Sequence, residues 1–376
     1  MRRKHRKWKH REETEPGLGG EGWVEWGGEL IWAVGFTEGG VPYGLTRAEY
    51  LAVNEAADVA AGAGWARARA LLRTLFEHWP GMPAAVEVGR VRSLGEGISR
   101  RAWSAWVDLD PDPAGMSGSY VVLLPLPEAE RSFDARVHWE ARLLVRLATL
   151  DLPLRLPRCA GLLPSGNRPA LIETGLEGFP LDLRAGRQPG IAPWEVVAQV
   201  AAAVHAVDRE TLGDGLPRCP GHATRREHAL AALRIFAGAP ETLLQEAHAW
   251  ALEHLPPADE PAVLLHGDLL GQNILLDLQG AAPGLIDWEY ARLGDPAYDL
   301  AIVTRGARRP FQIENGFGRL LEAYSGQGRE IRKEHVHLHE LCLLAGWYRE
   351  SLDGRLGGHP PEVRLGDFQR LFRRVG

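Results

Sequence analysis

Three oxygen-bearing side chains lie close together in the last third of this 376-residue sequence. The apolar run VLL leads to Asp268, Asn273 follows five residues later, and Asp287 lies in a second apolar stretch, L-I-D-W. A carboxylate and an amide oxygen are hard ligands of the kind that Mg²⁺ accepts, and Mg²⁺ commonly takes only one or two ligands from the protein and the others from phosphate groups and water. The pattern therefore predicts a magnesium–phosphate site with Asn273 and Asp287 as ligands.

The spacing of the two predicted ligands suggests a β-hairpin. Both lie seven residues from Gly280, which belongs to the turn sequence QGAAPG, and apolar runs stand on either side of that turn. Residues that face each other in an antiparallel pair have Cα atoms about 4.5–5.5 Å apart. We therefore expect Asn273 and Asp287 to face each other at the open end of the hairpin.

Asp268 precedes this hairpin and is not needed as a metal ligand. A carboxylate beside a metal–phosphate site can accept the hydrogen bond of an attacking hydroxyl group, and in phosphoryl transfer such positioning matters more than strong basicity. A lone aspartate in a loop is usually a turn or cap residue, whereas the whole pattern H-G-D-x4-N-I-L-x-D, a turn, then L-I-D-W is far more restrictive. We predict that Asp268 positions the acceptor hydroxyl and that His266 supports the loop through hydrogen bonds.

The segments HGDLLGQNILL and LIDWEYARLGDPAYDLA resemble the catalytic loop and the metal-binding segment of the aminoglycoside phosphotransferase and choline kinase family, whose fold is that of the protein kinases. The resemblance runs from about residue 86 to about residue 350. It implies an α+β, bilobal protein kinase-like fold, with a small β-rich N-lobe and a larger, mainly helical C-lobe behind an N-terminal extension. It also implies that ATP and Mg²⁺ are the cofactors and that the γ-phosphate moves to a hydroxyl of a small molecule. Asp268 matches the catalytic aspartate, and Asn273 and Asp287 match the magnesium ligands.

The same resemblance assigns residues to the nucleotide. Gly95 and Gly97, in the sequence GEG, fall where the family has its nucleotide-covering turn, and Glu140 falls on the helix that carries its ion-pairing glutamate. The stretch LIETGLEGFPL, which contains Glu173, resembles the hinge whose backbone contacts adenine. Without the family pattern, GEG is equally well a plain hairpin turn and Glu140 a solvated helix residue.

The sequence departs from the family at one position. The family places a lysine or arginine on its third strand, paired with the helix glutamate, but here that strand reads YVVLLP, residues 120–125. Lysine cannot substitute, since the chain has only four: Lys4, Lys7, Lys9 and Lys333. The nearest cations are Arg100 and Arg101, beside the glycine turn. Adjacent residues on a strand point to opposite faces, so we expect only one of the two arginines to reach the phosphates.

The remaining pattern predicts three parts. Residues 1–84 form a basic tail and an accessory unit, with a hairpin at 22–44, a helix from Thr46 to about residue 60 and a helical run from Gly64. Residues 85–175 alternate apolar and polar positions in five strands interrupted by one helix at 132–150, which is typical of an α+β lobe. Residues 176–376 are mainly helical and contain the catalytic loop and the predicted metal site.

Composition narrows the class of protein. No run of 18 apolar residues predicts a membrane-spanning helix, and three widely spaced cysteines favour a reducing compartment, so we expect a cytoplasmic protein without a membrane partner. The net charge of −6 gives no reason to expect nucleic acid as a partner, and the basic residues 1–11 are expected to be a solvated terminus.

Five further side chains are expected to be structural. By the resemblance, Asp295 and Asp299 brace the helical lobe, with Asp299 buried or acting as a cap. His335, His337 and His339 alternate as metal ligands on a strand would. They lie in a helical pattern, however, where a spacing of two separates them, so we expect them at the surface.

Two other functions fit part of the pattern. An inert kinase-like module that binds nucleotide and regulates a partner would explain the missing strand cation, but not the presence of all three oxygen-bearing residues. A metal-dependent phosphoesterase would need several histidines near His266, which the sequence lacks. The acceptor is left open, although twelve basic against nine acidic residues at 307–376 argue against a polycationic aminoglycoside.

Overall fold

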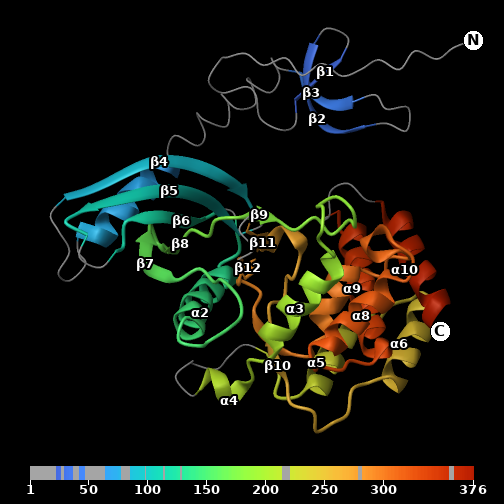
Figure 1. Ribbon diagram of the computed structural model, residues 1–376. Coiled ribbons are helices and arrows are strands. Elements are labelled where there is room, and N and C mark those ends of the chain that lie inside the picture. The colour runs from blue at the N-terminus through green and yellow to red at the C-terminus, as the bar shows by residue number, and fades with distance from the viewer. Residues whose placement is uncertain are drawn as a thin grey trace, which may run out of the picture. The chain divides into compact units, whose positions relative to one another are not determined.

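The computed structural model describes most of the chain (Figure 1). The chain forms two compact units, Met1–Arg67 and Ala68–Gly376. The finer division predicted from the sequence, with boundaries after residues 84 and 175, stays a prediction. The described residues are 23–26, 29–36, 42–46, 64–77, 85–97, 99–112, 115–127, 129–213, 221–277, 282–354 and 360–376.

Three short strands form an antiparallel sheet in the first unit, in the order β1-β2-β3. The sequence predicted a hairpin here, and the structure adds a third strand to it. The predicted helix that follows, to about residue 60, falls outside the described residues. The strands are β1 (Trp23–Trp26), β2 (Glu29–Phe36) and β3 (Pro42–Thr46).

The N-lobe of the second unit is a five-stranded antiparallel sheet in the order β4-β5-β6-β8-β7 (Figure 1). In β5 the buried side chains alternate with exposed ones, so one face of the sheet packs inward. Helical residues 68–77 of this unit contact the sheet, where Phe76 meets Tyr120 edge to face at 5.1 Å. The five strands and one helix predicted for this lobe are confirmed: β4 (Ala85–Glu96), β5 (Arg100–Asp110), β6 (Gly118–Pro125), α2 (Ser132–Leu147), β7 (Cys159–Ser165) and β8 (Arg168–Thr174).

Helix α2 carries a carboxylate on its buried face. The apolar residues Val137, Leu144 and Leu147 recur at helical spacing, and the helix packs against β7 and β8. Glu140 lies among these buried residues and is 0% exposed. A buried charge is tolerated only when it is paired, so this position requires a cation within reach of Glu140.

Helices dominate the C-lobe (Figure 1). Helix α3 is rich in alanine and valine, is buried along most of its length, and packs against α8. Within the described residues, no helix combines the length and the apolar character needed to cross a bilayer. The helices are α3 (Pro193–His205), α4 (Arg209–Leu212), α5 (Arg225–Ala232), η1 (Leu233–Phe236), α6 (Thr242–Glu253), α7 (Ala297–Thr304), η3 (Pro310–Gln312), α8 (Gly316–Gly326), α9 (Lys333–Leu352) and α10 (Pro361–Val375).

Short strands hold the loops that carry the predicted chemistry. Strand β10 pairs with β13, and β11 lies between β12 and β9 in a second small sheet. A single 3-10 turn leads into β11. The bounds are β9 (Phe179–Pro180), β10 (Val263–Leu265), η2 (Gly271–Asn273), β11 (Ile274–Leu276), β12 (Gly284–Leu285) and β13 (Arg292–Gly294).

The prediction that the three alternating histidines lie at the surface was wrong for two of them. His335 and His339 are 3% and 1% exposed, and only His337 is half-buried. The first two are four residues apart, one helical turn, and therefore share the buried face of α9. Their burial is tolerated because each ring has a polar partner: His339 Nε2 lies 3.1 Å from Asp295 Oδ2, and Arg225 Nη2 donates to His335 Nδ1 at 3.1 Å.

Candidate functional site

The loop that carries Asp268 is fixed by its backbone. Gly267 has a φ of +82°, and a Cβ there would lie 2.2 Å from the carbonyl oxygen of Tyr290, so only glycine fits. The N–H groups of His266 and Gly267 donate to the two carboxylate oxygens of Asp299, at 2.8 and 2.9 Å. Asp299 is fully buried, as predicted, and clamps the loop onto α7.

His266 has no nitrogen left for catalysis. The N–H of Asp268 donates to its Nδ1 at 3.3 Å, so Nε2 carries the proton and donates to the carbonyl of Ile286 at 2.9 Å. The ring is buried and meets Trp288 edge to face at 4.9 Å. It therefore ties the Asp268 loop to the strand that leads to Asp287.

Asp268 and Asn273 are directly bonded. The side-chain amide of Asn273 donates to the carbonyl of Asp268 at 2.8 Å and to its carboxylate at 3.1 Å, which leaves the amide oxygen of Asn273 for another partner. Burial raises the pKa of Asp268 above its ordinary value of 3.8, while His266 and the bond from Asn273 oppose the rise. The carboxylate is half-buried and borders a cavity.

The predicted hairpin exists, but its register differs by one residue from the prediction. Ile274 pairs with Leu285, and the N–H of Ile286 donates to the carbonyl of Asn273 at 3.0 Å, so Ile286 and not Asp287 lies opposite Asn273. A slip of one residue would turn the next side chain to the other face of a regular strand. Asp287 lies beyond the paired strand with a φ of +68°, and its side chain still meets Arg100, a residue of the site.

Arg100 links the two lobes through three carboxylates. Its guanidinium lies 2.5 Å from Glu140, 3.2 Å from Asp287 and 3.3 Å from Glu289, and the side chain is 7% exposed. Burial lowers the pKa of Arg100, but the three carboxylates raise it well above its ordinary value, so the guanidinium stays charged. Arg101 points elsewhere and pairs with the exposed Glu96.

The cation missing from β6 is thus supplied by the neighbouring strand. Arg100 begins β5 and pairs in register with Pro125, the last residue of β6, so its side chain starts close to the end of the strand that lacks a cation. The pairing of Arg100 with Glu140 also meets the requirement set by the buried helix glutamate.

The other residues predicted to bind nucleotide, Gly95, Gly97 and Glu173, lie on or beside the strands of the N-lobe sheet. Gly95 lies near the end of β4, paired with Ala102 of β5, and Gly97 follows β4, where its N–H donates to the carbonyl of Arg100 at 2.8 Å. Glu173 lies on β8 and is 6% exposed, before and not within the segment that leads to β9. Burial, and then the charge of Glu140, raise the pKa of Glu173 to about 8, while Arg100 opposes the rise.

Two residues of the site were missed in the sequence. Glu289 is an ion-pair partner of Arg100 and accepts a hydrogen bond from Ser99 Oγ at 2.7 Å. The signal was present, because an acid follows two residues after Asp287 in the stretch L-I-D-W-E-Y, and a strand that alternates would place both acids on one side. Ser99 carries no signal of its own, since a serine beside a glycine turn is commonplace.

Known proteins are similar to this chain in sequence and in fold. The sequence pattern of the phosphotransferase enzyme family matches residues 91–335. The chain belongs to this family. The matched segment includes every predicted catalytic, nucleotide and metal residue of the family site, from Gly95 to Asp287, and it ends within α9, before α10.

Individual relatives of the family are similar over part of their length. The chain is 30% identical over 189 residues to viomycin phosphotransferase of Streptomyces vinaceus, which is 46% of this chain and 63% of that protein. It is 40% identical over 240 residues to ethanolamine kinase 2 of Rattus norvegicus, which is 61% of this chain and 55% of the relative. The chain thus covers less than two thirds of either protein.

The fold is shared with a solved aminoglycoside phosphotransferase. A thermostable mutant of APH(4)-Ia, in a ternary complex with ADP and hygromycin B, superposes with a TM-score of 0.56 over 82% of this chain and 98% of that one, at 18% identity. The predicted α+β kinase-like fold, with its β-rich N-lobe and helical C-lobe, is therefore confirmed.

Proposed function

We propose that this family member transfers the γ-phosphate of Mg·ATP to a hydroxyl group of a small molecule. The observation that supports this most is the convergence of three segments: the start of β5, helix α2 and the paired loops around β11 and β12. Arg100 and Asp287 are 187 residues apart in sequence and 3.2 Å apart in space. A fold that served only as a scaffold would not need this arrangement of one buried cation and several acids.

Asp268 is proposed to accept the hydrogen bond of the acceptor hydroxyl. Its backbone N–H is held by His266 and its carbonyl by Asn273, so the carboxylate has a fixed direction. Positioning of this kind, together with acceptance of the proton late in the transfer, is what a loose phosphoryl-transfer transition state requires. Its bond from Asn273 also ties it to the proposed metal site.

Asn273 and Asp287 are proposed to hold Mg²⁺. The amide oxygen of Asn273 is left without a partner among the described residues once its NH₂ group has bonded Asp268, and the Asp287 side chain is 40% exposed. Two oxygen donors fit Mg²⁺, which keeps phosphate and water as its other ligands. The ion would neutralise charge on the nucleotide phosphates, while the chain fixes where those phosphates lie.

Arg100 and Glu140 are proposed to complete the phosphate site, with Gly95 and Gly97 covering the nucleotide. The guanidinium is held by a buried carboxylate on one side and lies beside Asp287 on the other. ATP is the proposed donor, as the family resemblance implies; solved structures of similar fold are named as complexes with ADP and with GDP. Glu173 also remains a proposed nucleotide-binding residue, because it belongs to the stretch LIETGLEGFPL, whose backbone is proposed to contact adenine.

The inert-module alternative loses its main support. It rested on the missing cation of the third strand, β6, and Arg100 of the neighbouring strand β5 lies opposite the last residue of β6. The phosphoesterase alternative is also weakened, since both ring nitrogens of His266 are engaged within the protein. A phosphotransferase therefore accounts for more of the site than either alternative.

The test is Mg·ATP turnover against a library of hydroxylated acceptors, with Asp268→Asn as the probe. We expect the variant to keep nucleotide binding and to lose at least about a hundredfold in kcat, the usual contribution of a positioned acid–base group. Asp259→Asn is the matched control, because Asp259 is exposed. If the Asp268 variant kept more than a tenth of the wild-type rate on the true acceptor, the proposed role would be wrong.

A further inference from the structure

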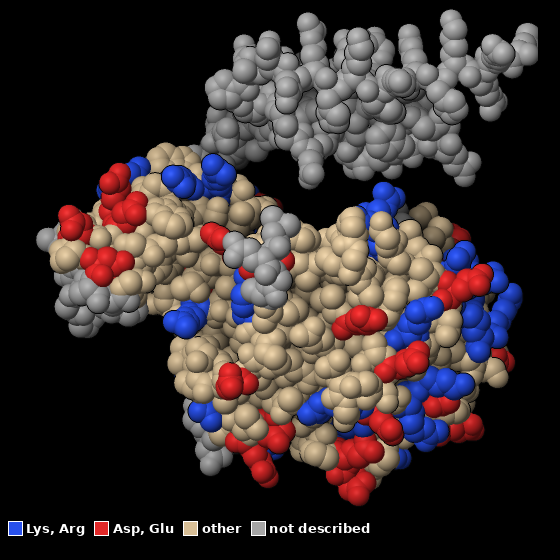
Figure 2. Space-filling view, viewed as in Figure 1, with Lys and Arg blue, Asp and Glu red and all other residues tan. Residues whose placement is uncertain are grey.

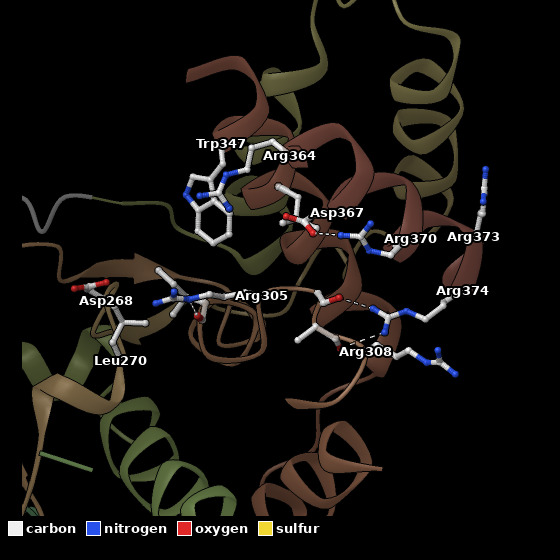
Figure 3. Close-up of a pocket in the computed structure, with 14 residues that line it drawn as sticks. Asp268, Leu270, Arg305, Arg308, Trp347, Arg364, Asp367, Arg370, Arg373 and Arg374 are labelled. Atoms are coloured by element: carbon white, nitrogen blue, oxygen red, sulfur yellow. Dashed lines mark hydrogen bonds and ion pairs between the residues drawn. The ribbon is translucent and has the colours of Figure 1, made fainter. Parts of the chain in front are cut away.

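A cavity of about 950 Å³ opens beside Asp268 on the side of the helical lobe (Figure 3). Its walls come from the end of α7 and the loop after it, from α9 and from α10. Two aspartates line it, Asp268 and Asp367, together with six arginines. The arginines are Arg305, Arg308, Arg364, Arg370, Arg373 and Arg374.

The positive charge of this arginine cavity is largely unopposed. Asp367 is already paired with Arg370, which leaves Asp268 as the other lining carboxylate. Arg308 and Arg373 are exposed, and no described residue forms a hydrogen bond or ion pair with either guanidinium. Figure 2 shows basic side chains gathered on the α10 side of the lobe, with acidic ones between them.

Two further arginines are oriented by stacking. Arg364 and Arg305 lie over the ring of Trp347, at 5.3 and 5.9 Å from its centroid. Nε of Arg364 is buried without a hydrogen-bond acceptor among the described residues, so the aromatic ring holds this guanidinium in place of a carboxylate. In Figure 3 the Arg305 side chain extends toward Asp268, which connects the arginine cavity with the proposed reaction centre.

Much of this wall lies outside the segment that the family shares. The family match ends at residue 335, whereas Trp347 and the arginines of α10 follow it. Helix α10 is held firmly, since Phe368 and Leu371 are fully buried. Four of the arginines are therefore presented by a fixed helix that follows the matched segment, while Arg305 and Arg308 lie within that segment.

We propose that the acceptor is a hydroxylated small molecule that also carries an anionic group, a phosphate or a carboxylate. This inference rests on the proposed phosphotransfer. The guanidinium fork binds both kinds of oxyanion through paired N–H donors, so the shared chemistry is a bidentate oxyanion. A polycationic acceptor in the same cavity would be repelled by six arginines.

The transfer balances with such an acceptor. Its hydroxyl oxygen forms a bond to the γ-phosphorus, and the bond between that phosphorus and the β–γ bridging oxygen breaks. ADP leaves with the electron pair, the hydroxyl proton passes to the Asp268 carboxylate and then to water, and the anionic group takes no part. The arginines hold that group, and this places the hydroxyl at Asp268.

The first test compares acceptors that differ only in the anionic group. Glycerol 3-phosphate and glycerate are each measured against glycerol, and ribose 5-phosphate against ribose, with choline and kanamycin as cationic probes. We expect the anionic members to be preferred in kcat/KM by about ten- to a hundredfold, the worth of a charge-assisted hydrogen bond. The phosphate and carboxylate arms identify which oxyanion is bound. A higher kcat/KM for a neutral or cationic member would overturn the inference.

The second test measures binding and needs no turnover. Inorganic phosphate and glycerol 3-phosphate are titrated into the whole protein with its nucleotide site filled by a non-hydrolysable Mg·ATP analogue. Arg364→Gln and the exposed Arg308→Gln should each weaken anion binding about tenfold, without changing nucleotide affinity, while Arg329→Gln, outside the cavity, should not. Equal anion binding by all four proteins would refute the arginine cavity as the site.

The two tests separate the proposals. A protein that binds phosphate through Arg364 and Arg308 but transfers nothing from ATP to any acceptor would refute the proposed function and leave the anion site standing. A protein that phosphorylates choline or kanamycin in preference to the anionic acceptors would support phosphotransfer and refute the anionic acceptor.

Discussion

Removal of the Arg100 guanidinium should destabilise the protein strongly and in a pH-dependent way. In Arg100→Ala, Glu140 would lie 0% exposed with no paired cation left among the described residues, whereas Asp287 and Glu289 are nearer to solvent. Breaking a buried ion pair by removing one partner costs about 3–5 kcal/mol. Most of that cost therefore comes from Glu140.

Protonation of Glu140 sets a ceiling on this cost. A carboxyl group whose ordinary pKa is 4.5 can take up a proton at pH 7 for about 3.4 kcal/mol. Burial already raises the pKa of Glu140 in the intact protein, where Arg100 opposes the rise, and loss of Arg100 in the variant raises it further. When the pKa of a carboxyl group is higher in the folded than in the unfolded state, the free energy of unfolding is highest at low pH and falls as the pH rises. The destabilisation should thus be about 3 kcal/mol at pH 7 and shrink by up to about 1.4 kcal/mol per pH unit toward pH 5.

Urea unfolding followed by tryptophan fluorescence measures this free energy at each pH. Arg101→Ala is the matched control, because its pair with Glu96 is exposed and should contribute at most about 1 kcal/mol. Adding Glu140→Gln to Arg100→Ala removes the unpaired charge and should restore much of the stability. If Arg100→Ala lost no more stability than Arg101→Ala, or lost the same amount at pH 5 and pH 7, the arginine would not be the counter-ion of Glu140.

Three further predictions concern the metal, the base and a buried histidine. Asp287→Ala should abolish the Mg²⁺ dependence of ATP affinity, measured by calorimetric titration. Asn273→Ala should weaken that dependence less, since an amide carries no charge. If Asp287→Ala bound Mg·ATP as tightly as the wild type does, the proposed metal site would be wrong. On the acidic side, kcat/KM should fall with a midpoint above pH 3.8, because burial raises the pKa of Asp268. Asn273→Ala should move this midpoint to higher pH, since it removes a hydrogen bond to the Asp268 carboxylate. An unchanged midpoint would refute the role of Asp268 as the group that accepts the proton. Burial lowers the pKa of His335 to about 4, where its Nδ1 accepts from Arg225, so unfolding free energy should fall by up to about 1.4 kcal/mol per unit from pH 6.5 toward 4. His335→Gln should flatten this dependence, and an unchanged slope in urea unfolding would show that other groups cause it.

The fold and the cluster of site residues could be read from the sequence because both depend on local pattern. Alternation predicted the strands of the N-lobe, and the contiguous pattern around His266, Gly267 and Asp268 marked the loop that carries Asp268. The hairpin register could not be predicted to the residue. Symmetry about Gly280 pointed to Asp287 as the partner of Asn273, and the structure places Ile286 there. A positive φ at Asp287 is a local conformation that spacing cannot reveal.

The burial of polar side chains was the second feature that could not be predicted from the sequence. Helical periodicity separates His337 from its neighbours but does not tell which face is buried when histidines occupy both. His335 and His339 are buried because Arg225 and Asp295, far away in sequence, supply partners for their ring nitrogens. Such pairing is a tertiary property, so a prediction from one helix alone put these side chains at the surface.

The position of Arg100 shows how the fold can supply a cation to the proposed phosphate site from a neighbouring strand. The helix glutamate is buried and needs a positive charge within reach, but nothing in that requirement specifies which strand supplies it. Arg100 begins β5 directly opposite Pro125 at the end of β6, and arginine has a longer side chain than the distance between neighbouring strands, about 4.8 Å. A guanidinium that starts one strand away can therefore occupy the same space as a cation on β6. The prediction tied to this reasoning is that Arg100→Lys restores only part of ATP affinity relative to Arg100→Ala. A lysine supplies the charge but cannot contact Glu140 and Asp287 together through a planar fork. Full restoration, measured as the KM for ATP, would show that charge alone is sufficient and that the fork geometry plays no part.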